Sequence, residues 1–85
     1  MRIRRLKSFD KDFARLKPAQ RNRLKESLII FVENPMHPDL YNHPLTGDWK
    51  GYRSIAFGGD WRAHYKAVNN EAVFVACGTH AQLYK

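Results

Sequence analysis

The sequence predicts an α+β domain in which two amphipathic helices pack on a mainly antiparallel sheet of about four strands. Apolar residues recur at helical spacing within the first 34 residues, whereas residues 51–77 contain short apolar runs separated by turn-forming residues. Helices followed by a run of strands are typical of α+β rather than parallel α/β folds. With 85 residues in all, the chain is expected to form a single domain over residues 1–85.

The first part of the chain predicts a short edge strand and then a helix. Residues 2–7 carry Arg and Lys side chains around two apolar ones, which suits an exposed sheet edge because charge discourages pairing with other chains. Phe9, Phe13 and Leu16 then recur at i, i+4 and i+7, which predicts one apolar helix face. Ser8 is the predicted N-cap of this helix.

A second helix is predicted to begin at Pro18, because proline is favoured in the first helical turn. Its apolar stripe consists of Leu24, Leu28 and Phe31, broadened by Ile29, Ile30 and Val32. Asn34-Pro35 is predicted to end the helix, since proline cannot continue the hydrogen-bond ladder. Residues 34–50 show no periodicity, so we expect an ordered arm laid along the sheet and held by apolar anchors, which are Met36, Leu40, Tyr41, Leu45 and Trp49.

The second half predicts three strands joined by tight turns. Residues 51–57 form one strand, residues 58–60 a glycine-rich turn, and residues 61–68 the next strand. Residues 69–70 are both Asn, which tolerates the positive φ that two-residue turns require. Residues 72–77 are almost wholly apolar, as expected of a central strand that is buried on both faces.

Charge is concentrated at the N-terminus. Residues 1–25 contain ten Lys and Arg against two Asp, a net charge of +8, whereas residues 26–85 contain five basic and six acidic side chains, a net −1. This asymmetry is typical of proteins that bind nucleic acid or an acidic protein partner. No apolar run is long enough to cross a bilayer, and no signal-peptide core follows the basic start. The single cysteine, Cys77, suits a reducing compartment, so we expect a cytoplasmic protein in which Cys77 is a small buried hydrophobe.

Several side chains of this sequence could together cleave RNA. Cleavage without a metal needs a base for the 2′-hydroxyl proton, an acid for the leaving 5′-oxygen, and cations beside the phosphoryl group. Histidine serves in either proton role because its pKa lies near neutral pH. The chain supplies the required side-chain types in His37, His43, His64, His80, Asp60, Arg53, Arg62 and Tyr84.

Alternation along one predicted strand indicates how some of these groups could meet. Arg62, His64 and Lys66 alternate with apolar residues, so a strand places them on one sheet face and the apolar set under the helices. We therefore expect Arg62 and His64 on an exposed polar face. Asp60 and His80 flank predicted strands whose ends can lie close together. An exposed polar face without any substrate fits the same pattern equally well.

Other kinds of site find less support in the sequence. His37 and His43 are six residues apart with no cysteine nearby, which is not a usual zinc-ligand spacing, so no metal or other cofactor is expected. The Gly58-Gly59 pair is not followed by a helix, unlike a phosphate-binding loop. Trp49 is expected to anchor the core or a loop rather than to stack on a base.

One stretch resembles a known family. Residues 43–53, HPLTGDWKGYR, resemble the HPL-x-G-x-W-x-GYR signature of YafQ-type toxins in the RelE/ParE superfamily. The resemblance continues in the DW, YK, GTH and L-[FY] motifs, which stand here at residues 60–61, 65–66, 78–80 and 83–84. It implies a RelE-like compact fold and the toxin of a type II toxin–antitoxin pair. The implied activity is that of an mRNA interferase, a ribosome-dependent endoribonuclease that needs no metal.

The resemblance also implies roles for individual residues. His43, Asp60 and His80 fall at catalytic positions of the family, and Tyr84 replaces a functional phenylalanine. Basic residues that RelE-type relatives use around the scissile phosphate correspond to Arg53 and Arg62. The implied site therefore comprises catalytic His43, Asp60, Arg62, His80 and Tyr84, with Arg53, His64 and Lys50 binding the substrate.

One family position differs in this chain. YafQ-type toxins carry a further catalytic histidine four residues before the aspartate, and the residue there is Ala56. Alanine can neither donate nor accept a proton, so we hypothesise that His64 or Arg62 supplies the missing group.

The resemblance implies a cognate antitoxin, the ribosome and mRNA as partners, with DNA reached only through the antitoxin and no membrane contact. Two alternatives stay open on the sequence. One is a ParE-like inhibitor of DNA gyrase, and the other is a catalytically weakened family member that acts only by binding. The retained His80, Asp60 and Arg62 favour the nuclease, whereas Ala56 favours the alternatives.

Overall fold

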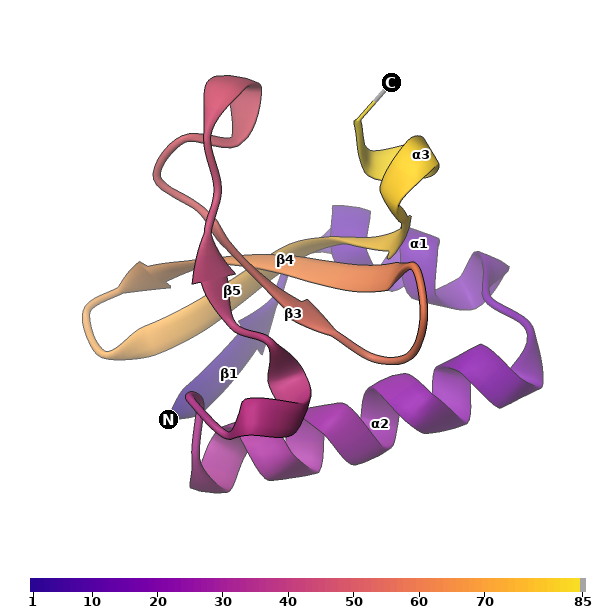
Figure 1. Cartoon of the computed structure of the whole chain (residues 1–85), viewed down its shortest axis with the longest axis horizontal. Coiled ribbons are helices and arrows are strands. Elements are labelled where there is room, and N and C mark those ends of the chain that lie inside the picture. Colours follow the sequence, from indigo (N-terminus) through magenta and orange to yellow (C-terminus); the bar gives the residue numbers. More distant parts are fainter. Residues whose placement is uncertain (85) are drawn as a thin grey trace.

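The computed structural model describes residues 1–84 and contains one five-stranded sheet with the order β1-β5-β4-β3-β2 (Figure 1). The strands are β1 (Arg2–Arg5), β2 (His43–Pro44), β3 (Arg53–Ala56), β4 (Trp61–Val68) and β5 (Glu71–Thr79). The helices are α1 (Lys7–Arg15), α2 (Pro18–Glu33) and α3 (His80–Leu83), with 3-10 turns η1 (Pro38–Leu40) and η2 (Gly47–Trp49). All strand pairs are antiparallel except β1–β5. The predicted α+β class is confirmed, with one strand more than expected.

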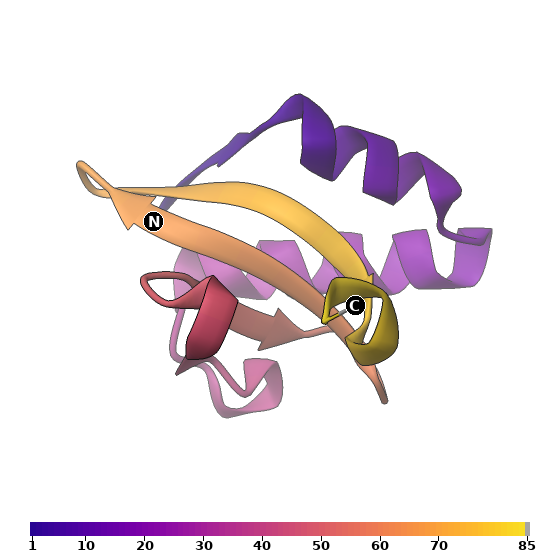
Figure 2. The same cartoon turned by 90° about the horizontal axis from the view of Figure 1, so that it is seen from above.

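Helices α1 and α2 cover one face of the sheet, and the core lies between them and the strands (Figures 1 and 2). Phe31 of α2 packs edge-on against Tyr65 of β4 and Phe74 of β5, with ring centroids 5.0 and 5.4 Å away. Both predicted helical stripes face the core: their end residues Phe9, Leu16, Leu24 and Phe31 are buried, and the central Phe13 and Leu28 are partly buried against them. The strands thus rest on an aromatic layer that fixes the orientation of the sheet.

The predicted breadth of the second stripe was wrong. Ile29 is 66% exposed and Val32 is 47% exposed, because only one side of α2 faces the sheet. Pro18 and Asn34 do mark the two ends of this helix as predicted. No helix within residues 1–84 combines the length and the apolar character that crossing a membrane requires.

The prediction that Ser8 caps the first helix was also wrong. Helix α1 begins at Lys7, and its N-cap residue Leu6 makes no side-chain cap. The Ser8 hydroxyl instead donates a 2.7 Å hydrogen bond to the carbonyl of Val75 in β5. Ser8 thus helps to cover an edge of the sheet instead of capping its own helix.

Helix α1 completes the hydrogen bonding of β5 beyond the end of β1. Strand β1 pairs with β5 only as far as Phe74, so the later residues of β5 have no strand beside them there. The Asp12 carboxylate accepts a 3.1 Å hydrogen bond from the backbone N–H of Cys77, and Ser8 bonds the carbonyl of Val75. Two side chains of α1 therefore take the place of a strand, because buried backbone groups must find partners.

Residues 34–50 form the predicted ordered arm. The arm contains η1, then β2, which pairs with β3 and adds the fifth strand, and then η2. Figure 1 shows η2 and α3 on the side of the sheet away from α2. The indole Nε1 of Trp49 donates a 3.1 Å hydrogen bond to the carbonyl of Leu83, which joins η2 to α3. The second sheet face is therefore covered by the arm and the C-terminal helix.

The hairpin between β4 and β5 confirms the turn prediction. Asn69 and Asn70 have φ values of 50° and 65°, in the left-handed region that Asn tolerates. Strand β4 has the predicted bounds, and β5 extends the predicted apolar run at both ends. The register shifts between His64 and Tyr65, which marks a β-bulge in the middle of the hairpin.

Candidate active site

Strand register brings distant residues into one row across the sheet. His43 of β2 pairs with Ser54 of β3, and Ser54 pairs with His64 of β4. Directly paired residues share a face, and so do residues two apart along a strand. Ala56 and Arg62, which pair with each other, therefore lie on the same face as His64. This is the face that η2 and α3 cover.

His64 lies at the centre of this face and is completely buried. The Trp49 ring packs edge-on against it with centroids 4.5 Å apart, and the Tyr84 ring lies 5.6 Å away. Neither ring nitrogen of His64, nor the hydroxyl of the facing Ser54, has a hydrogen-bond partner within residues 1–84. The prediction that His64 occupies an exposed polar face was wrong, because strand alternation does not reveal what covers a face.

The surroundings of His64 keep it neutral. Its pKa is lowered from 6.5 to about 4, and burial is the largest cause, since desolvation disfavours the imidazolium form. Smaller electrostatic contributions to this lowering come from His43, Arg62 and His80. Three separate segments of the chain thus place titratable or cationic groups around one imidazole. We call His43, His64 and His80, together with Arg62 and Tyr84, the histidine cluster.

Helix α3 holds His80 and Tyr84 in place. Thr79 and Gln82 form a capping box, with bonds of 3.2 Å from the Gln82 N–H to the Thr79 hydroxyl and 2.9 Å from the Thr79 N–H to the Gln82 side chain. His80 and Tyr84 are four residues apart, and their rings stack with centroids 4.4 Å apart at 28°. With Trp49 bonded to Leu83, the helix is fixed at both ends.

The turn before β4 places Asp60 and Arg62 beside this helix. The backbone N–H of His80 donates a 3.1 Å hydrogen bond to the carbonyl of Asp60. The Arg62 Nη1 donates to the carbonyls of Gly59 and Trp61 at 2.8 and 3.1 Å. Both bonds use one terminal nitrogen, so Nη2 remains to donate to a bound anion. The structure thus brings Asp60, Arg62 and His80 to one corner of the molecule.

His43 is exposed at the opposite side of the cluster. Its Nδ1 lies 2.8 Å from the carbonyl oxygen of Tyr41. A carbonyl oxygen only accepts hydrogen bonds, so Nδ1 carries a proton and, in the neutral ring, Nε2 is left with a free lone pair. His43 is therefore arranged to accept a proton at Nε2.

An open hollow of about 380 Å³ adjoins the cluster. It is lined by Asp39, Tyr41, Ala56, Gly58, Gly59 and Arg62, and we call it the Ala56 hollow. Ala56 is the position at which the resemblance implied a histidine. Its cross-strand partner Arg62 is the only cation among the residues that line this space.

One predicted substrate-binding residue, Arg53, faces away from the cluster. Arg53 pairs with Tyr65, whose ring packs under α2, and its Nε donates a 2.8 Å hydrogen bond to the side chain of Asn42. The placement of Arg53 with the cluster is therefore not supported, because Ser54 faces the cluster and its strand neighbour must face away. Lys50 is exposed directly after η2, and its substrate role stays a prediction.

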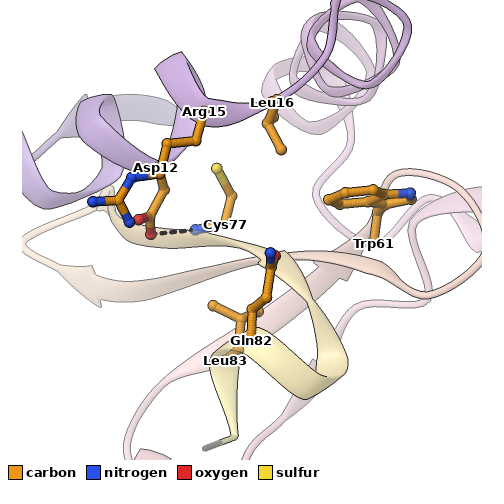
Figure 3. A pocket seen from close by; sticks show the side chains of 7 residues that line it. All are labelled: Asp12, Arg15, Leu16, Trp61, Cys77, Gln82 and Leu83. Carbon is orange, nitrogen blue, oxygen red and sulfur yellow. Dashed lines mark hydrogen bonds between the residues drawn. The ribbon is translucent and has the colours of Figure 1, made fainter.

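A second cavity, of about 170 Å³, lies between α1 and α3 (Figure 3). Its carboxyl group, from Asp12, and its thiol, from Cys77, are not available for chemistry. The Asp12 carboxylate accepts the Cys77 N–H, and burial, reinforced by the Asp12 charge, raises the pKa of the Cys77 thiol to about 12. The cavity contains no predicted catalytic residue; it is lined by Asp12, Arg15, Leu16, Trp61, Cys77, Gln82 and Leu83.

The cluster and the neighbouring Asp60 offer the elements of acid–base chemistry on a phosphodiester: imidazole nitrogens, a carboxyl group and a guanidinium. Within residues 1–84, no three His, Cys, Asp or Glu side chains are grouped so that they could hold a metal ion. Sequence reasoning missed Ser54, which no motif marks. Its prediction that Met36 and Tyr41 anchor the arm was wrong, because their side chains are 61% and 72% exposed, whereas Leu40 and Leu45 are buried. Sequence reasoning identified Trp49 as an anchor but did not predict its contact with His64, because that contact depends on the fold of the arm.

Comparisons with known proteins agree with this architecture. The family model described as the bacterial toxin of type II toxin-antitoxin systems, YafQ, matches residues 1–85. The mRNA interferase toxin YafQ of Escherichia coli K12 is 35% identical over 79 residues, which cover 91% of this chain and 86% of that protein. The crystal structure of YafQ from E. coli BL21(DE3) superimposes with a TM-score of 0.80 at 32% identity, covering all of both chains. YafQ in the E. coli DinJ–YafQ complex gives a TM-score of 0.78 at 34% identity, again over both full chains. The chain therefore belongs to the YafQ family of toxins from bacterial type II toxin–antitoxin systems.

Proposed function

We propose that this chain is an endoribonuclease toxin that cleaves mRNA on the ribosome and is held inactive by a cognate antitoxin. The observation that carries the proposal is the histidine cluster. His43, Arg62 and His80 come from three separate segments, yet all three act on the charge state of His64. The activity that names the E. coli relatives fits such a cluster, because RNA cleavage requires two proton transfers beside a cation.

The proposed reaction is the attack of a ribose 2′-hydroxyl on the adjacent phosphorus. Nε2 of His43 takes the hydroxyl proton as the 2′-oxygen bonds to phosphorus. His80, with Asp60 beside it, gives a proton to the departing 5′-oxygen. The products are a 2′,3′-cyclic phosphate and a 5′-hydroxyl end, so protons and bonds balance. Tyr84, stacked on His80, fixes the orientation of its ring.

The placement of the two candidates favours Arg62 over His64 as the replacement for the family histidine. Arg62 pairs directly with Ala56 and lines the same hollow. Its guanidinium can stabilise the charge that develops on the phosphoryl oxygens. His64 is buried under Trp49 and Tyr84 and is neutral, so it is a positioning residue that supports the rings around it.

The charge distribution supports the ribosome and the antitoxin as partners. The net charge of +8 in residues 1–25 suits contacts with the phosphates of ribosomal RNA, whose strength falls steeply with salt. The same surface would attract an acidic protein segment. The solved complex of E. coli YafQ with DinJ supports the assignment of an antitoxin partner to this chain.

Primer extension on translated mRNA after induction of the toxin tests the proposal. We expect discrete cuts with the unaltered chain and about a 10²–10⁴-fold loss of cleavage with His80→Gln, because one proton transfer then lacks its donor. Val68→Ala, at the far end of the β4–β5 hairpin, is the matched control and should cut normally. Growth arrest without cuts would indicate a gyrase inhibitor instead, and neither effect would indicate a member that only binds.

A further inference from the structure

We propose that the Ala56 hollow is a nucleobase subsite, in which one base of the mRNA stacks on Tyr41 and turns its edge toward Asp39. The inference rests on the proposed function and deepens it, since it names what the hollow beside the cleavage chemistry binds. Neither residue belongs to the family motifs identified in the sequence.

Tyr41 is presented to solvent in a way that packing does not explain. Its side chain is 72% exposed, although it is one of only four tyrosines in the chain. Its backbone, with a φ of 49°, is the left-handed residue that ends η1, and its N–H bonds the carbonyl of Pro38, so the end of this turn directs the side chain outward. An exposed aromatic ring is also the usual platform for an unpaired RNA base.

The loop that presents Tyr41 also orients a catalytic candidate. The carbonyl of Tyr41 accepts the hydrogen bond from Nδ1 of His43 at 2.8 Å. A base held on the Tyr41 ring would therefore be attached to a nucleotide whose sugar and phosphate lie close to His43. Arg62, on the other wall of the hollow, keeps Nη2 for that phosphate.

The space in the hollow fits this use. Its volume of about 380 Å³ falls within the range of small-molecule sites, roughly 300–1,000 Å³. It is lined by the small residue Ala56, and Gly59 adds no side chain to the adjoining wall. A larger residue at position 56 would take up the room that the base needs.

Asp39 gives the subsite a chemical preference. Asp39 is among the residues that line the hollow, its side chain is 77% exposed, and one of its carboxylate oxygens lies 3.9 Å from Nδ1 of His37. An ionised carboxylate accepts hydrogen bonds and donates none. Guanine offers this carboxylate two adjacent N–H donors, and adenine and cytosine each offer an amino group. Uracil presents one N–H between two carbonyl oxygens, and the carboxylate repels these two oxygens. We therefore expect the subsite to favour guanine and to disfavour uracil.

Binding of short RNA, measured by NMR, tests the subsite independently of cleavage. The probes are trinucleotides with a 2′-deoxy sugar at each position, which cannot be cleaved by 2′-hydroxyl attack, and with guanine or uracil at the central base. Guanine should bind more tightly and should shift the amide signals of Gly58 and Gly59. Tyr41→Ala should weaken binding about 5- to 100-fold, and Tyr41→Phe should retain it, because stacking needs the ring and not the hydroxyl.

Two further variants examine the walls of the hollow. Asp39→Asn should reduce the preference for guanine over uracil, and Ala56→Leu should block binding by filling the space. Val68→Ala is the matched control for an exposed apolar residue outside the hollow and should bind normally. Thermal unfolding of each variant shows whether a loss of binding comes from a loss of fold. If a variant does not fold, the subsite is judged from Tyr41→Phe and from the comparison of guanine with uracil on the unaltered chain.

The results separate failure of the subsite from failure of the proposed function. If translated mRNA is cut but Tyr41→Ala binds the trinucleotide as tightly as the unaltered chain, the subsite is wrong and the nuclease stands. If no mRNA is cut but guanine binding depends on Tyr41 and shifts Gly58 and Gly59, the subsite stands and the nuclease is wrong. Equal affinity for guanine and uracil would overturn the assigned role of Asp39.

Discussion

The burial of the polar His64 ring lowers the stability of the folded protein. His64 is fully buried, its ring nitrogens are without partners in residues 1–84, and it packs on Trp49 and Tyr84. An aliphatic residue would fill the same space without any desolvation cost. The cost is consistent with a residue kept for the site rather than for stability.

The depressed pKa of His64 makes stability depend on pH. Its pKa is about 4 in the fold and 6.5 as an ordinary histidine, so between these values the unfolded chain binds a proton that the folded chain does not. Stability should therefore fall as the pH drops from about 6.5 to 4, by up to about 3 kcal/mol from this group. The free energy of unfolding in urea, compared between pH 7 and pH 4.5, measures this loss of stability.

The variant His64→Leu separates this effect from the titration of carboxylates. Leucine does not titrate, so the variant should lose less stability between pH 7 and 4.5 than the unaltered chain does. The difference between the two losses is the contribution of His64. Equal losses would show that His64 is protonated in the fold at the lower pH.

Individual site residues could be predicted from the sequence only in part. The motif positions of Asp60 and His80, and the alternation around Arg62, led to residues that the fold brings to one corner, and the motif position of His43 led to a further member of the same cluster. The burial of His64 and the orientation of Arg53 could not be predicted. Both depend on the arm and on the register of β3 against β4, and a local pattern carries no information on either.

At the scale of elements, α1 acts as a substitute strand beside β5. The Asp12 carboxylate bonds the N–H of Cys77, whereas Asp10 on the same helix makes only an exposed ion pair with Arg5 at 3.7 Å. Asp12→Ala should destabilise the protein by about 1–3 kcal/mol, because it leaves a backbone donor unsatisfied. Chemical denaturation at pH 7 measures this change.

Asp10→Ala is the matched control for Asp12→Ala. It removes the same carboxylate from the same helix, but at a solvent-exposed position, so it should cost less than about 1 kcal/mol. Similar costs for both variants would show that the bond to Cys77 adds no stability beyond a general helix effect.

The elements themselves were predictable where local chemistry decides them. Pro18, the Asn34-Pro35 pair and the Asn69–Asn70 turn set boundaries through backbone geometry alone. Strand β2 could not be predicted, because its two residues have no strand pattern and are extended only through their pairing with β3. The start of α1 was misplaced because Ser8 satisfies a carbonyl of β5 instead of its own helix.

At the scale of the whole molecule, residues 1–25, the basic N-terminal segment, carry a net charge of +8 while the remaining residues carry −1. If this segment binds ribosomal RNA, each lost phosphate contact should lower the slope of log affinity against log salt by about 0.7–0.9. The double variant Arg4→Gln/Lys11→Gln, with both residues exposed, should flatten that slope without altering the fold. Sedimentation with ribosomes at several salt concentrations measures it.

Glu71→Gln is the control for this charge experiment, because it changes one charge outside the basic N-terminal segment. Its slope should match that of the unaltered chain. An unchanged slope for the double variant would place the ribosome contacts elsewhere on the surface.

The single thiol of this chain has a practical consequence for studies of motion. Cys77 is buried in β5, and its raised pKa leaves almost no thiolate at neutral pH. A maleimide dye or a nitroxide spin label should therefore react with a cysteine introduced at an exposed position such as Val68 and leave the native one unmodified. Distance measurements between the arm and the hairpin can thus be made without first replacing Cys77.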